Sequence, residues 1–257
     1  MNAALLSVRG IRKCYGERVA LEDVSFDLWP GDVLAVVGES GSGKSTLLDA
    51  IAARSAPDAG LVQFRQRDGQ LQDVFALGLA RQRLLARTDW GFVHQNPADG
   101  LRMEVSAGAN VGERLMGLGE RHYGRLRATA IEWLQRVEID ANRIDDAPRS
   151  FSGGMRQRLQ IARNLVTQPR LIFMDEPTSG LDVSVQARLL DLLRQLTRQM
   201  QLAVVIVTHD LAVARLLAHR MLVMQRGRVV ESGLTDQLLD DPQHPYTQLL
   251  VSSVLPP

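Results

Sequence analysis

A glycine-rich stretch near the N-terminus has the composition of a phosphate-binding loop. The run GESGSGKS spans residues 38–45 and satisfies the pattern G-x-x-x-x-G-K-[ST]. Backbone amides in such a loop point inward and the following helix N-terminus adds partial positive charge, so a polyphosphate can bind there. Lys44 is expected to reach the β and γ phosphates of a nucleotide, and Ser45 to bind Mg²⁺. The residues expected to contact the nucleotide here are Gly38, Glu39, Ser40, Gly41, Ser42, Gly43, Lys44, Ser45 and Thr46.

Two adjacent carboxylates follow an apolar stretch in the sequence LIFMDE, residues 171–176. Ligands bind at the carboxyl ends of strands in open α/β sheets, so this pair stands where chemistry is expected. Asp175 would support Mg²⁺, and Glu176 would activate the attacking water as general base. The same pair could simply open a solvated turn before Pro177. The phosphate loop in the same chain favours the catalytic interpretation.

A third element is FSGGMRQR, residues 151–158. Ser152 is a good helix N-cap, and the two glycines after it allow another group to approach the backbone closely. A helix N-terminus is an anion site, and the chain already has one. By itself, however, this stretch reads as a capped turn before a helix.

The elements that must position these residues begin with a strand pattern. Leu6, Val8 and Ile11, and then Val24, Phe26 and Leu28, indicate an N-terminal antiparallel β-layer. Residues 33–37 predict a buried strand, and Leu47, Leu48 and Ile51 predict a helix after the glycine loop.

From about residue 99 to 164 the pattern changes to helices, with Ile131, Leu134 and Val137 spaced for one buried face. Apolar strands return at 171–174 and 203–207 with a helical pattern between them, which implies a parallel sheet. A hairpin is expected around Arg226-Gly227.

Composition bounds the class of protein. The 257 residues carry 30 basic and 29 acidic side chains, a net charge of +1, so no whole-chain field favours nucleic acid. Cys14 is the only cysteine, which excludes an intrachain disulfide and suits a cytoplasmic location. No apolar run is long enough to span a bilayer, so a membrane would be reached only through another subunit.

The order of these motifs over nearly the whole chain resembles the nucleotide-binding subunits of the ATP-binding cassette (ABC) family. The resemblance implies a cytoplasmic ATPase that uses ATP and Mg²⁺. It places Tyr15 where an aromatic ring stacks on adenine, Gln95 between the Mg²⁺ site and the helical segment, and His209 on the γ-phosphate. It also implies an ATP-dependent homodimer in which Ser152, Gly153, Gly154 and Asp182 of one subunit face the ATP of the other.

One residue departs from the family pattern. The glutamine usual after the two signature glycines is Met155 here, which cannot donate a side-chain amide hydrogen bond. Peptide-importer members have the same variant, so we expect altered kinetics and not inactivity.

Two branches of the family share features with this chain. The tail HPYTQLL (244–250) and FSGGM resemble ATPase subunits of oligopeptide and dipeptide importers. The stretches at 88–102, 106–116, 121–124 and 137–146 resemble the cassette subunit of the bacterial carbon–phosphorus lyase system for phosphonates. These stretches lie mostly in the segment that chooses a partner in the family, which favours docking on the lyase complex. A third hypothesis, a non-hydrolysing ATP-dependent adaptor, is disfavoured by the intact Lys44, Asp175, Glu176 and His209.

The sequence therefore predicts an α/β protein with a P-loop NTPase core, an N-terminal antiparallel β-layer and an inserted α-helical lobe. The predicted boundaries are 1–98 and 165–232 for the core, 99–164 for the lobe and 233–257 for the tail.

Overall fold

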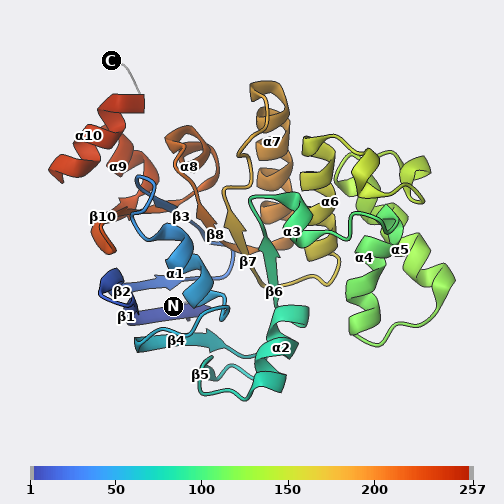
Figure 1. Ribbon diagram of the computed structural model, residues 1–257, viewed down its shortest axis with the longest axis horizontal. Helices are drawn as coiled ribbons and strands as arrows, with labels where there is room; N and C mark the ends of the chain where they lie inside the picture. Colours follow the sequence, from blue (N-terminus) through green and yellow to red (C-terminus); the bar gives the residue numbers. More distant parts are fainter. Residues whose placement is uncertain (1–2, 255–257) are drawn as a thin grey trace. The chain divides into compact units, whose positions relative to one another are not determined.

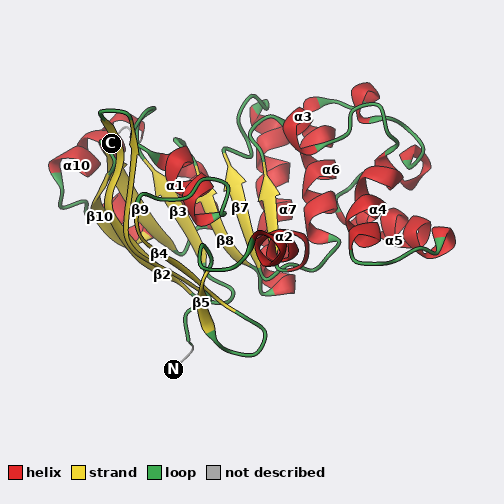
Figure 2. Ribbon diagram, turned by 60° about the horizontal axis from the view of Figure 1, so that its bottom comes forward, coloured by secondary structure: helices red, strands yellow, loops and turns green. Residues whose placement is uncertain are grey.

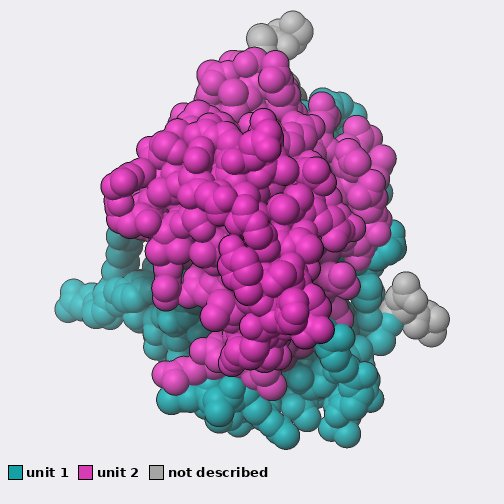
Figure 3. All heavy atoms as spheres, turned by 90° about the vertical axis from the view of Figure 1, so that its right-hand side faces the viewer, with its two compact units in different colours: residues 1–82, 201–257 teal, residues 83–200 magenta. Residues whose placement is uncertain are grey.

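The computed structural model describes residues 3–254 and divides into two compact units. Unit 1 consists of residues 1–82 and 201–257, and unit 2 of residues 83–200, coloured separately in Figure 3. Among the described residues, no helix combines the length and the apolar character that a membrane span requires. The predicted boundaries of a lobe at 99–164 and a tail at 233–257 remain predictions.

Unit 1 contains the predicted antiparallel layer, whose strands run side by side in Figure 2. Its order is β2-β1-β4-β5, and each neighbouring pair is antiparallel. All six alternating apolar side chains that predicted the first two strands are buried, which is why the pattern was readable. The last two strands were not predicted. The bounds are β1 Leu6–Tyr15, β2 Arg18–Leu28, β4 Ala59–Arg65 and β5 Leu71–Asp73.

A second sheet in unit 1 is built around β3 (Val33–Val37). This strand pairs in parallel with β8 (Ala203–Val207) and with β9 (Arg220–Gln225). Every residue of β3 and β8 is buried, as expected for parallel strands covered on both faces. The predicted hairpin joins β9 to β10 (Arg228–Leu234).

Helices follow these strands in unit 1 (Figure 1). The helix after the glycine loop is confirmed, with Leu47, Leu48 and Ile51 fully buried. The tail forms two helices that the sequence analysis did not assign. The bounds are α1 Lys44–Ile51, α8 Leu211–Leu217, α9 Thr235–Asp240 and α10 Pro245–Val254, while α2 (Leu79–Thr88) crosses the boundary between the units.

Unit 2 is mostly helical and contains two parallel strands. In Figures 1 and 2, α4, α5 and α6 lie side by side. On α5, Leu134 and the following Val137 are buried, whereas Ile131 is only half-buried. The bounds are β6 Trp90–Val93, α3 Pro97–Gly100, α4 Ala107–Gly117, α5 Tyr123–Arg136, α6 Gly153–Leu165, β7 Leu171–Asp175 and α7 Val183–Met200, with two 3₁₀ turns at Ala141–Arg143 and Pro148–Ser150.

Candidate active site

The glycine-rich loop between β3 and α1 has a backbone that side chains would obstruct. Gly38 has φ 149°, and a Cβ added there would lie 2.2 Å from the carbonyl oxygen of Met224. Gly43 has φ 106°, and its added Cβ would lie 2.6 Å from the carbonyl oxygen of Ala20. Both obstacles are backbone atoms, which cannot rotate away as a side chain could. The loop therefore requires glycine at these two positions.

Lys44 is buried beneath this loop. Its ammonium donates to the carbonyl oxygens of Gly38, at 2.7 Å, and Glu39, at 2.8 Å, so the cation is fixed under the loop backbone. Gly43 is the N-cap residue of α1, and no side chain caps this helix. Within the described residues, the buried Ser42 hydroxyl has no hydrogen-bond partner. A buried cation, an uncapped helix start and an unpaired buried hydroxyl together fit a polyphosphate.

Two further predicted residues belong to unit 1. Tyr15 ends β1 with 54% of its surface exposed, and the Lys13 ammonium lies over its ring at 5.7 Å from the centroid. Arg18, its register partner, lies 3.8 Å from where a Gly41 Cβ would stand, so this turn borders the phosphate loop. His209 follows β8, the parallel neighbour of β3, and is exposed. The structure thus brings His209 and the loop to the same sheet edge.

The predicted acidic residues lie in unit 2 at the end of β7. Val93 of β6 is in register with Met174 of β7, so the segments that follow these parallel strands are neighbours. Gln95 donates from Nε2 to Glu176 Oε2 at 3.0 Å and to Ser179 Oγ at 3.2 Å. The structure therefore brings Gln95 to the carboxylate that the sequence predicted as general base.

Glu176 has a strained backbone. Its φ of 40° lies in the left-handed region, where a residue with a Cβ is disfavoured by about 1 kcal/mol or more. Strain of this kind persists where surrounding contacts hold it, and the bond from Gln95 is one such contact. The backbone at Glu176 thus directs a carboxylate at an energetic cost.

The signature turn before α6 forms the predicted cap. Ser152 Oγ accepts a hydrogen bond from the amide of Met155 at 3.3 Å. A Cβ on Gly154 would lie 2.4 Å from Val185 Cγ1, whereas one on Gly153 would make ordinary contact at 3.6 Å with Leu181. The second glycine therefore permits close packing on the start of α7. No such contact requires the first glycine.

Asp182 accepts hydrogen bonds at the start of a helix in unit 2. Its carboxylate accepts from Ser184 Oγ at 2.7 Å and from the amide of Val185 at 3.0 Å, at the start of α7. The hydrogen bond from Ser184, with that from Val185, lowers the pKa of Asp182 below its usual value. Its expected contact with a partner's ATP remains a prediction.

Two sets of contacts at these loops were not anticipated. The amide of Glu39 donates to the hydroxyl of Tyr246, on α10, at 3.0 Å. In unit 2, side chains of α6 hold the backbone of His94, directly before Gln95. The sequence carried little signal for the second set, because three arginines lie among the amide side chains of α6 and the pattern does not tell which polar residues are buried. Tyr246 offered no signal.

Taken by their chemistry, these loops define a phosphate-loop ATPase with a cassette signature. A family model described as ABC transporter matches residues 21–179. The chain is 66% identical over 255 residues to a protein of Escherichia coli (strain K12) named for phosphonates utilization, the ATP-binding protein PhnK, with 99% of each chain covered. It is 39% identical to a protein of Brucella ovis named for peptide import, over 98% of this chain and 79% of the relative.

Solved structures agree with this likeness. The dimeric post-hydrolysis state of the ATP-binding cassette MJ0796, bound to ADP and Pi, superposes with a TM-score of 0.79 at 30% identity, covering 90% of this chain and 98% of that one. CbiO1 from Clostridium perfringens, part of the ABC transporter complex cbiONQ, gives 0.81 at 25% identity over 100% and 97%. The chain belongs to the ABC transporter family and is an ATP-hydrolysing cassette. The predicted fold class is confirmed.

Proposed function

We propose that this protein is the ATPase subunit of a phosphonate-processing carbon–phosphorus lyase system. The observation that carries the proposal is full-length identity of 66% to PhnK, against 39% to a peptide-import relative. The four segments that resemble the lyase-system subunit all lie between residues 88 and 146, within unit 2. In this proposal the ATPase subunit docks on a soluble lyase complex in the cytoplasm.

In the proposed reaction Lys44 binds the β and γ phosphates and His209 contacts the γ-phosphate. Tyr15 stacks on adenine. Glu176 acts as general base toward the attacking water, because phosphoryl transfer chiefly needs a positioned nucleophile and stabilised charge. The bond from Gln95 supports this role, since it fixes the carboxylate.

Mg²⁺ fits the donors assigned to it. Ser45, Gln95 and Asp175 offer hydroxyl, amide and carboxylate oxygens, the ligand types that Mg²⁺ prefers. The amide nitrogen of Gln95 is directed to Glu176 and Ser179, which leaves its amide oxygen for a cation. The ion would neutralise charge on the phosphates.

The working form in this proposal is a homodimer. Ser152, Gly153 and Gly154 of one subunit, with Asp182, face the ATP held by the phosphate loop of the other. The dimeric state of the MJ0796 cassette supports this arrangement. Closure of two ATP sites would move both helical segments together and change the shape of the docked lyase complex.

Capture of partners by a closed dimer tests the proposal. Tagged Glu176→Gln should bind ATP, turn it over at least about 100-fold more slowly, and accumulate as a dimer. From cells grown on a phosphonate, this variant with ATP and Mg²⁺ should retain the soluble lyase complex more strongly than without nucleotide. The matched control is Glu176→Gln combined with Ser152→Arg, which should bind ATP and fail to close.

Recovery of transmembrane permease subunits without lyase components would replace the proposal with the peptide-importer alternative. That alternative is supported by the tail sequence HPYTQLL and by the 39% identity. A Glu176→Gln protein that hydrolyses ATP at the parental rate would contradict the assignment of the base.

A further inference from the structure

The signature helix α6 carries a row of buried polar side chains. Gln157, Gln160 and Asn164 are each at most 2% exposed. Their spacing of three and four residues places them on one face of the helix. A buried amide side chain destabilises the fold unless it is hydrogen-bonded. Each of these three side chains therefore needs hydrogen-bond partners inside the protein.

Their main partners are the backbone of β6 and of His94, the residue before Gln95. Gln157 donates to the His94 carbonyl at 3.4 Å and accepts from Gln160 Nε2 at 3.2 Å. Gln160 Oε1 accepts from the amide of His94 at 2.6 Å, and its Nε2 donates to the carbonyl of His94 at 3.1 Å. Asn164 Oδ1 accepts from the amide of Phe92 at 3.0 Å. Gln160 thus holds both polar backbone groups of His94.

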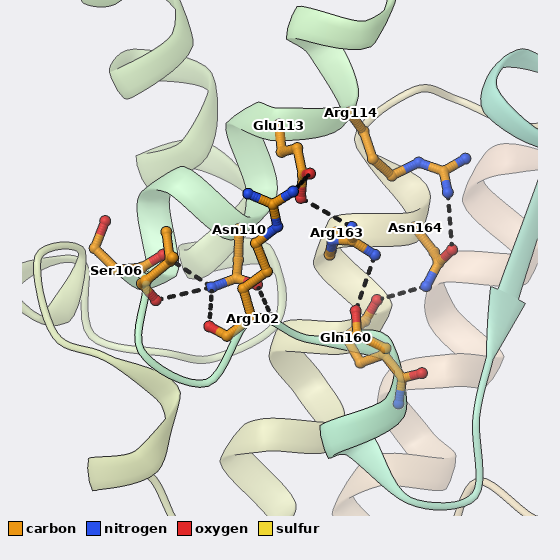
Figure 4. A network of polar contacts seen from close by, with 10 residues as sticks. Arg102, Ser106, Asn110, Glu113, Arg114, Gln160, Arg163 and Asn164 are labelled. Carbon is orange, nitrogen blue, oxygen red and sulfur yellow. Dashed lines mark hydrogen bonds and ion pairs between the residues drawn. The ribbon is translucent and has the colours of Figure 1, made fainter.

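The row is braced within unit 2. Asn164 Nδ2 donates to the carbonyl of Gln160 at 2.9 Å, and Arg114 donates to Asn164 Oδ1 at 3.3 Å, both drawn in Figure 4. Burial lowers the pKa of Arg114 to about 10, so it remains a cation at neutral pH. Arg114 also donates to the carbonyls of Ala86 and Trp90 at 3.0 and 2.9 Å.

Helix α6 also contacts the other end of the segment that begins at His94, at Gly100, the last residue of α3. Arg163 donates from Nη1 to the carbonyl of Gly100 at 2.9 Å and pairs through Nη2 with Glu113 at 3.0 Å. A Cβ on Gly100 would lie 2.4 Å from Gln160 Oε1, so the backbone of Gly100 lies directly against the Gln160 side chain. The segment 94–100, which contains Gln95, is therefore held by α6 at both ends.

We infer that Gln160 is a positioning residue for ATP hydrolysis, which places Gln95 against Glu176 by holding His94. The inference rests on the proposed roles of Gln95 and Glu176. One peptide bond separates His94 from Gln95, and one hydrogen bond separates Gln95 from Glu176. Since α6 begins at the signature turn, a movement of that turn reaches the carboxylate through Gln160.

The test compares Gln160→Met with a control in the same unit. Methionine keeps the length of the side chain and removes both hydrogen bonds between Gln160 and His94. The longer bond from Gln157 Nε2 to the His94 carbonyl, at 3.4 Å, remains. Asn110, fully buried on α4, bonds the backbone of Arg102 and Val105 in the same manner and does not touch the 94–100 segment's start. Asn110→Leu should lower the melting temperature by as much as Gln160→Met does.

Only Gln160→Met should lower kcat, by at least about 10-fold, since small misplacements of reacting groups have large effects on rate. Its dissociation constant for a fluorescent ATP analogue should change by less than about threefold, because Lys44 and the phosphate loop are untouched. A control that loses kcat equally would make the effect of Gln160 one of stability alone and overturn the inference.

A double-mutant cycle with Gln95→Ala separates the inference from the proposed function. If Gln160 acts through Gln95, Gln160→Met should lower kcat little further in the Gln95→Ala background. If the two substitutions instead lower kcat by factors that multiply, Gln160 does not act through Gln95. That result would overturn the positioning role of Gln160 and leave the proposed role of Gln95 unaffected. A Gln95→Ala protein with parental kcat would instead overturn the proposed role of Gln95.

Discussion

The phosphate loop and the signature turn both place glycine and serine at the start of a helix, and they differ in how the free amides of that helix start are satisfied. At α1 no side chain caps the N-terminus, and the buried Lys44 ammonium lies beneath the loop. At α6 the Ser152 hydroxyl caps the helix. The first helix start, with a lysine cation beneath it, can therefore bind an anion by itself, whereas the amides of the second are already partly satisfied by its own serine.

Their glycines differ in the same sense. Gly38 and Gly43 have positive φ and lie against backbone atoms, so they shape the loop itself. Gly154 faces a valine side chain and Gly153 has room for a Cβ. Packing within this chain therefore does not require glycine at position 153, which leaves room for a group from outside the chain. The comparison favours a phosphate loop that binds ATP in its own subunit and a signature turn that contacts the ATP of a partner subunit.

The largest expected effect is on the phosphate loop. Lys44→Ala should reduce turnover by at least about 100-fold and weaken ATP binding, because the cation is lost where phosphate charge must be stabilised. Steady-state hydrolysis and nucleotide titration would measure both. Retention of parental affinity would show that the loop backbone alone binds the phosphates.

Ser152→Arg should reduce turnover by a similar factor of about 100 while leaving ATP affinity within about threefold, because bulk and charge block closure and not binding. Mixing it with Lys44→Ala sharpens the test. A mixed dimer has one site with both residues intact, so an equal mixture of two inactive proteins should regain about a quarter of the parental sites. No recovery in verified mixed dimers would contradict the arrangement in trans.

The two signature glycines should differ in stability. Gly154→Ala should lower the melting temperature by several degrees, since its Cβ meets Val185 in a packed region and overpacking costs about 1–3 kcal/mol. Gly153→Ala, with ordinary contact distances, should leave it unchanged or raise it. Calorimetry of the two variants without nucleotide gives the comparison. Equal melting temperatures would refute the packing argument.

The smallest effect is expected at the tail. Tyr246→Phe removes the hydroxyl that accepts the Glu39 amide, a neutral hydrogen bond worth about 1 kcal/mol. ATP affinity should fall by about two- to fivefold, with the melting temperature changed by a few degrees at most. Tyr123→Phe, on an exposed tyrosine of unit 2, is the matched control and should leave ATP affinity unchanged.

Much of the fold was predictable because each correct assignment depended on local pattern. The alternation of Leu6, Val8 and Ile11, and the cap at Ser152, follow from rules that involve neighbouring residues only. The strand β6 was not assigned, since a four-residue strand containing Gly91 carries little pattern and depends on α6 to hold it.

The candidate site was predictable to the same degree. The acidic pair after an apolar stretch pointed to Glu176 and the family resemblance implied Gln95, and the structure adds the hydrogen bond between them. The hold of Gln160 on His94 joins residues 66 positions apart, which no local pattern reports. At Asp182 a local pattern was present and was not used. An aspartate two residues before Ser184 can accept hydrogen bonds at a helix start, but we assigned Asp182 only through the family resemblance.

The left-handed backbone at Glu176 implies a conflict between durability and activity. Glycine adopts that conformation without a steric penalty, so Glu176→Gly should relieve about 1 kcal/mol of strain that glutamate sustains, offset in part by the greater chain entropy of glycine when unfolded. Selection for thermal resistance alone would therefore tolerate loss of the carboxylate, and only selection for turnover would retain it. A library of variants at position 176, sorted first for survival of heating and then for hydrolysis, should yield two populations with little overlap.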